Sequence, residues 1–144
     1  MENFEDKGKH NYGLGFWKKK ETRDHFDYLL KGQFIKTYVM SDEQFVQKHS
    51  FKYDYIHLDG DHRYFGAKKS FELFWPRLKE KGYISFHDIH FEAESKGIKF
   101  EQWKLWEELI KKHGYKMEFS NDYSGIGIIQ KITKKRKRFK KKFD

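Results

Sequence analysis

The chain has 144 residues, of which 19% are aromatic and none is cysteine. This length allows one hydrophobic core and therefore one domain. Without cysteine there is neither a disulfide framework nor a thiolate site, so a bound metal would need oxygen and imidazole ligands. Residues 1–7 lack the apolar core of a signal peptide, and no segment approaches the ~18 apolar residues of a membrane span. We therefore expect a cytoplasmic protein with no membrane span.

The basic charge is concentrated at the C-terminal end. Residues 131–144 hold nine Lys or Arg and one Asp, which leaves residues 1–130 nearly neutral although the whole chain carries +9. We predict a single domain over residues 1–132 and a disordered basic tail over residues 133–144. Because such a tail attracts phosphates, any nucleic acid would bind through it alone.

The first half of the chain alternates between strand and helix patterns. Apolar runs predict strands at 12–17, 34–40 and 53–58, while helical spacing predicts a helix over 21–30. Ser41 is a suitable cap for a helical turn that extends through Val46.

The second half continues this alternation. Apolar residues three and four apart predict a helix from Tyr64 to Leu78, weakened by Pro76 and ended by Gly82. A strand at 83–86, a helix at 99–113 and two strands at 115–120 and 125–131 follow. The short connection at 121–124 predicts that the last two strands form an antiparallel hairpin.

Two of these strands end in acidic and histidine residues. The strand at 53–58 leads into Asp59, Asp61 and His62, and the strand at 83–86 leads into three similar residues, His87, Asp88 and His90. A right-handed crossover makes the two strands parallel, with their carboxyl ends at one edge of the sheet. We therefore expect all six side chains to converge.

The motif Asp-x-Ile-His-x-Asp-Gly-x-His-x-Tyr at 54–64, together with the alternating elements and the final hairpin, resembles the class I S-adenosylmethionine-dependent methyltransferases. The metal-dependent O-methyltransferase branch is most similar. The resemblance runs from about 12 to 131 and is most specific at 54–64 and 78–88. It implies an α/β fold with a Rossmann-like sheet, mostly parallel with a C-terminal antiparallel hairpin and shortened at the N-terminus. It also implies methyl transfer from S-adenosylmethionine to a hydroxyl of a small molecule or sugar.

The resemblance assigns roles to individual residues. Asp59 and Asp88 match the family's ligands for a divalent cation, most simply Mg²⁺, and His87 lies where a further ligand often stands. His62 matches the general base, with Asp61 orienting the base or the metal. A hard cation on carboxylates lowers the pKa of a bound hydroxyl, and histidine can accept its proton. The cofactor-binding positions are matched by Gly15, Ser41, Asp42 and Asp59.

Two departures concern the cofactor site. No strand with a glycine-rich turn precedes residue 12, and Gly15 stands where the family places an acidic residue for the ribose. Since the missing strand is central in the family's sheet, its neighbours would be unpaired. The strands could close up, a second chain or another copy in a homo-oligomer could complete the sheet, or the sequence could be part of a longer protein.

Three other interpretations remain open. His57, Asp59, Asp61 and His62, with the cluster that follows the second strand, could hold one or two metals for phosphoester hydrolysis. The chain could also be a non-catalytic remnant that binds anionic partners through its tail. Finally, the acidic turn could be a polar loop with capping aspartates, and His57 a core residue within a strand.

Overall fold

The computed structural model describes residues 19–95, 97–113, 116–119 and 124–132. The helices and strands of these residues are, in chain order, α2 (Lys20–Leu29), α3 (Asp42–Lys48), β1 (Tyr53–Leu58), α4 (Tyr64–Phe74), the 3₁₀ helix η1 (Trp75–Arg77), β2 (Leu78–His87), β3 (Ala93–Ser95), β4 (Ile98–Phe100), α5 (Gln102–His113), β5 (Lys116–Phe119) and β6 (Ile126–Gln130).

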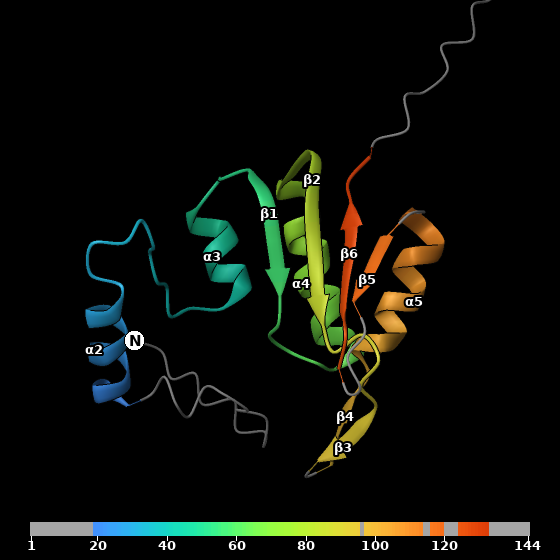
Figure 1. Ribbon diagram of the computed structural model, residues 1–144, viewed down its shortest axis with the longest axis horizontal. Helices are drawn as coiled ribbons and strands as arrows, with labels where there is room; N and C mark the ends of the chain where they lie inside the picture. The colour runs from blue at the N-terminus through green and yellow to red at the C-terminus, as the bar shows by residue number, and fades with distance from the viewer. Residues whose placement is uncertain (1–18, 96, 114–115, 120–123, 133–144) are drawn as a thin grey trace, which may run out of the picture.

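The main sheet has four strands in the order β1-β2-β6-β5. β1 and β2 are parallel, while β6 is antiparallel to both of its neighbours. Three strands therefore run in one direction and β6 alone runs in the other (Figure 1). This arrangement confirms the predicted α/β fold and its C-terminal antiparallel hairpin, while one of the three pairings between the strands of this sheet is parallel.

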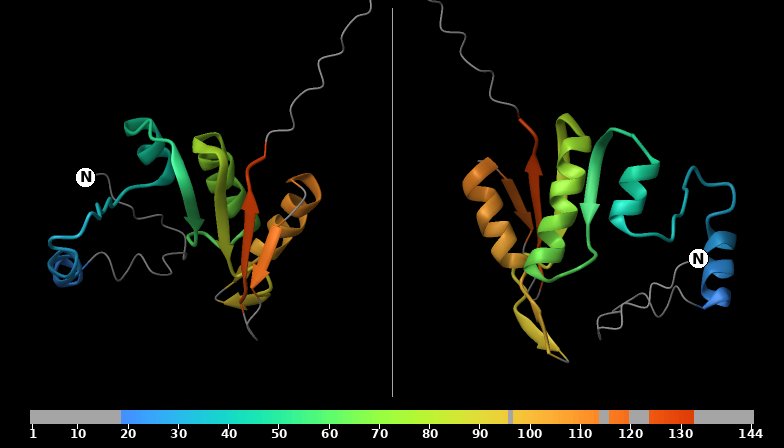
Figure 2. Two further views of the ribbon diagram at one scale, coloured as in Figure 1. Left: turned by 45° about the horizontal axis from the view of Figure 1, so that its top comes forward. Right: turned by 180° about the vertical axis from the view of Figure 1, so that it is seen from behind.

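Helices α3, α4 and α5 lie against the same face of this sheet (Figure 2). Ala67 and Phe71, four residues apart on α4, are buried, as are Leu105 and Leu109 on α5. They pack against strand residues whose side chains are also buried, namely Ile56, Ile84, Phe86 and Ile129. α2 lies beyond α3, away from the sheet (Figure 1), and none of its residues is buried.

The prediction of a strand at 34–40 is wrong. The segment has no regular secondary structure, and Phe34, Ile35 and Val39 are all exposed. β-branched and aromatic residues favour a strand only where a neighbouring strand and a packed face are available, and the described residues provide neither here. The strand predicted at 12–17 lies outside the described residues. β1 is consequently an edge strand of the described sheet.

The helix after the acidic turn is shorter than predicted. α4 ends at Phe74, Pro76 lies in η1, and β2 begins at Leu78. Gly82 does not end a helix but lies inside β2, where a Cβ would stand 2.8 Å from the carbonyl oxygen of Asp54. Lys81 beside it has φ 65°, so this pair forms a local irregularity in the strand.

Two connections complete the description. Between β2 and α5 the chain forms the antiparallel strands β3 and β4, which the sequence pattern did not predict, so the helix predicted at 99–113 begins only at Gln102. The predicted final hairpin is confirmed by the antiparallel pairing of β5 with β6, although residues 121–123 lie outside the described part.

Among the described helices, none has the length and apolar character required to cross a membrane.

Candidate active site

Four of the predicted residues meet at the carboxyl ends of β1 and β2. Asp59 directly follows β1, His62 lies in the turn before α4, His87 ends β2 and Asp88 follows it. One atom from each of Asp59, His62 and Asp88 can be chosen so that all three lie within 4.8 Å of one another. His87 Nδ1 is 2.9 Å from Asp88 Oδ1 and 3.6 Å from Asp59 Oδ1. The parallel pairing thus produces the predicted convergence for these four.

Asp88 is held in an unusual backbone conformation. Its φ is 55°, in the left-handed region that aspartate tolerates better than most residues. Its side chain is only 13% exposed, whereas that of Asp59 is 46% exposed. Strained backbone of this kind often occurs at functional sites, and here it orients a carboxylate toward the end of β1.

The imidazole of His62 lies between the two carboxylates. Nδ1 is 2.6 Å from Asp88 Oδ2, and Nε2 is 3.4 Å from Asp59 Oδ1. Although it is close to Asp88, the buried Nδ1 makes no aligned hydrogen bond to a described residue. Two converging carboxylates, with the imidazole nitrogen of His87 beside both, suit a divalent cation, so these residues fit a metal.

The segment leading into α5 supports this cluster, and nothing in the sequence pattern predicted that role. Gln102 is buried and its Nε2 donates a hydrogen bond of 2.6 Å to the carbonyl oxygen of His87. The backbone N–H of Glu101 donates to the carbonyl oxygen of His62 over 2.8 Å. The ring of Phe100 lies edge-on to that of His62. A glutamine that begins an amphipathic helix carries no signal of such a contact.

Asp61 points to Arg63 rather than to the other carboxylates. The backbone N–H and Nε of Arg63 donate to Asp61 Oδ1 over 3.0 and 2.8 Å, and Nη2 binds the second oxygen. Burial would raise the pKa of the Asp61 carboxyl, but the hydrogen bonds from Arg63 outweigh burial and hold the pKa below its usual value. Gly66 permits this arrangement, because a Cβ there would overlap the Asp61 carboxylate.

Two of the histidines expected at the site, His57 and His90, lie outside the cluster. His57 Nδ1 is 2.7 Å from the Ser85 hydroxyl, which also contacts the Tyr55 hydroxyl at 2.6 Å. His90 lies beside Gly125, since a Cβ on that glycine would be 2.7 Å from the His90 ring. The structure therefore does not assemble the larger ligand set that a two-metal hydrolase would use.

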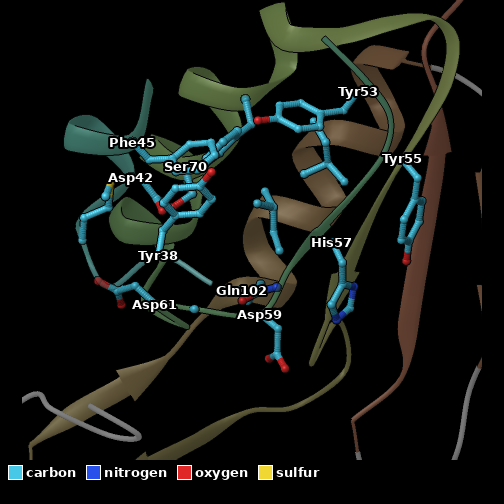
Figure 3. Close-up of a pocket in the computed structure, with 15 residues that line it drawn as sticks. Tyr38, Asp42, Phe45, Tyr53, Tyr55, His57, Asp59, Asp61, Ser70 and Gln102 are labelled. Carbon is cyan, nitrogen blue, oxygen red and sulfur yellow. The ribbon is translucent and has the colours of Figure 1, made fainter. Parts of the chain in front are cut away.

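A cavity of about 530 Å³ extends from Asp59 along β1 to α3. Asp42, Phe45 and Tyr38 gather at one end of it, whereas His57 and Asp59 lie at the other (Figure 3). Asp42 accepts a hydrogen bond from Ser70. The Ser41 hydroxyl accepts a hydrogen bond from the backbone N–H of Gln44, and the backbone N–H of Ser41 donates one to the Gln44 side chain, so Ser41 caps α3. Gly15, the remaining cofactor position expected from the sequence, lies outside the described residues.

Comparisons with known proteins identify the class of protein to which this fold and site belong. A family model described as a methyltransferase domain matches residues 5–89. The chain belongs to that family.

The structure of a putative caffeoyl-CoA O-methyltransferase from Staphylococcus aureus has a similar fold, with a TM-score of 0.56 and 17% identity. The match covers 78% of this chain but only 61% of that one, so the chain spans about three fifths of the length of this structural relative. No curated protein gives a match. Together, the family model and the fold confirm the resemblance of this chain to a methyltransferase domain.

Proposed function

We propose that the chain contributes to methyl transfer from S-adenosylmethionine to a hydroxyl of a small molecule or sugar, assisted by a divalent cation. The observation that carries the proposal is the meeting of Asp59, His62 and Asp88 within 4.8 Å at the carboxyl edge of the parallel strands. Ligands of open α/β sheets bind at this edge. The family match supports the choice of methyl transfer over other metal-assisted reactions.

The residues that would hold the cation are Asp59 and Asp88, with His87 as a further ligand. The expected ion is Mg²⁺ because carboxylate oxygens are its preferred ligands, while an added imidazole would also suit Mn²⁺. When bound, the cation would stabilise the deprotonated form of an acceptor hydroxyl. Gln102 keeps His87 in place through its hydrogen bond to the His87 carbonyl oxygen.

His62 would act as the general base. Since Nδ1 is buried beside Asp88, Nε2 is the nitrogen that would accept a proton. Asp61 acts as a positioning residue, because its pairing with Arg63 braces the turn that carries His62. A positioned base contributes roughly 10²- to 10⁴-fold to a reaction rate.

The cavity between β1 and α3 would receive the nucleoside part of the cofactor. Its volume is in the range of small-molecule sites, roughly 300–1,000 Å³. The aromatic rings of Tyr38 and Phe45 lie 5.3 Å apart at the end nearest Asp42, where a purine could be enclosed. Ser41 would act indirectly, by capping α3 and so fixing Asp42.

The test is transfer of labelled methyl from S-adenosylmethionine to catechol and sugar acceptors, with and without Mg²⁺. Asp59→Asn should lower the metal-dependent rate by roughly 10²-fold or more, as expected for loss of a catalytic group. Asp54→Asn is the matched control, because Asp54 lies at the other end of β1 and pairs with Lys79 at the surface. Full activity of Asp59→Asn would contradict the proposal.

A further inference from the structure

A second cavity, of about 360 Å³, lies apart from the cavity between β1 and α3 and shares no lining residue with it. It is bounded by one side of α5, by strand β5 and by the residues that follow β2. Its polar and aromatic lining consists of His90, Glu92, Trp103, Trp106, Glu107 and Glu118. We propose that this cavity, named here the acidic cavity, binds a small aliphatic diamine with both amino groups protonated. The proposal goes beyond methyl transfer and does not rest on it.

The charge of the lining is negative. Glu92, Glu107 and Glu118 contribute to it, whereas no lysine or arginine does, although the chain has 31 Lys and Arg against 22 Asp and Glu. No ion pair joins any of these glutamates to another residue that the structure describes. A hollow lined by charges of one sign concentrates ions of the opposite sign. The acidic cavity is therefore suited to a cationic ligand.

The spacing of these carboxylates favours an organic cation over a metal ion. A metal ion needs ligand atoms that converge, and in the described part of the chain only Asp59, His62 and Asp88 bring three such atoms within 4.8 Å of one another. The three glutamates of the acidic cavity do not converge in this way. A ligand that is longer than a single ion and carries two positive charges can reach carboxylates placed around a cavity. The volume suits a small molecule, since such sites begin at roughly 300 Å³.

Two indole rings form the apolar part of the lining. Trp103 and Trp106 lie three residues apart on α5 and therefore on the same side of the helix. Trp106 is buried, and its Nε1 donates a hydrogen bond of 2.8 Å to Glu118, which fixes that carboxylate. The Trp103 ring already attracts one cation, because Lys104 Nζ lies 5.4 Å from its centroid. A bound diamine would place an ammonium group near these rings and its methylene groups against their carbon atoms.

A calorimetric titration of the full chain with putrescine, a four-carbon diamine, tests the proposal without any S-adenosylmethionine. We expect saturable binding near one molecule per chain and no binding of the corresponding diol, which has the same length but no charge. Combining Glu92→Gln with Glu107→Gln should weaken putrescine binding about ten-fold, within the range expected for the loss of two ion pairs. Glu72→Gln combined with Glu94→Gln is the matched control, because it removes two exposed charges that do not line the acidic cavity.

NMR of the indole N–H groups locates the ligand in the unmodified chain, so this measurement does not depend on the folding of any variant. The signals of Trp103 and Trp106 should shift as putrescine is added, whereas that of Trp75, which does not line the acidic cavity, should not. A folded chain that binds no putrescine would overturn the proposal, and so would equal weakening by the two pairs of substitutions. Tighter binding of N-acetyl-lysine amide than of putrescine would also overturn it, because the cavity would then suit a lysine of a protein partner.

Discussion

The Nδ1 atom of His62 lies 2.6 Å from Oδ2 of Asp88. One residue follows β1 and the other follows β2, so their contact depends on the parallel pairing of these two strands. The same pairing brings His87 Nδ1 to 3.6 Å from Asp59 Oδ1. A site divided between two strand ends is thus a direct consequence of the sheet topology.

Asp88→Asn should remove most of the affinity for a divalent cation. Loss of a residue that only supports a metal ligand lowers metal affinity about 10- to 100-fold, so loss of the ligand itself should lower the affinity at least that much. The measurement is a calorimetric titration with Mg²⁺ and with Mn²⁺. The fold should persist, because an amide of nearly equal size replaces the carboxylate. Unchanged affinity in the variant would exclude Asp88 as a ligand.

Gly127→Ala should destabilise the fold by about 1–3 kcal/mol, the usual effect of adding atoms to a packed core. A Cβ at this position would stand 2.7 Å from three ring carbons of Trp106, which is buried and hydrogen-bonded to Glu118. Gly60→Ala is the control, since a Cβ there meets nothing within 4 Å. Urea denaturation of both variants provides the comparison, and equal stabilities would contradict the packing described here.

Arg63→Gln should raise the pKa of Asp61. At present the hydrogen bonds from Arg63 outweigh the effect of burial, and the variant would lose those of the side chain and keep only the one from the backbone N–H. NMR titration of the Asp61 carboxyl carbon measures the change. An unchanged pKa in the variant would show that the Arg63 side chain does not stabilise this carboxylate.

His113 should make the fold sensitive to acid. Burial, with a smaller effect of Lys112, lowers its pKa below the usual 6.5, and its ring packs on Trp75. The unfolded chain then takes up the proton more readily than the folded chain, so stability is complete above pH 6.5 and is lost as the pH falls below that value.

In His113→Leu, the fall in melting temperature between neutral and mildly acidic pH should be smaller than in the unmodified chain. His25→Leu serves as a comparison, because His25 is exposed on α2. An identical acid dependence in His113→Leu and the unmodified chain would assign the effect to other groups.

The parts of the fold that depend on local pattern could be predicted. The spacing of Ala67 and Phe71 on α4 and the capping residue Ser41 of α3 are visible in the sequence, and the fold has both features. The alternation of strand and helix predicted the parallel pair, and with it the meeting of Asp59 and Asp88.

The features that the sequence did not predict depend on contacts between residues that lie far apart in the sequence. Residues 34–40 have the composition of a strand but no described neighbour with which to pair. The bond from Gln102 to the carbonyl oxygen of His87 joins α5 to β2, and no local pattern announces it. His90 resembles His87 in the sequence, but the chain turns between them and carries His90 away from the cluster, against Gly125.

The most direct test of the proposed function is a calorimetric titration of the purified chain with S-adenosylmethionine, with and without Mg²⁺. The proposal predicts saturable binding near one molecule per chain, and it predicts that Asp42→Ala weakens that binding. A folded chain that binds no S-adenosylmethionine under either condition would contradict the assignment of a cofactor site to these residues, and the metal cluster should then be tested for hydrolysis.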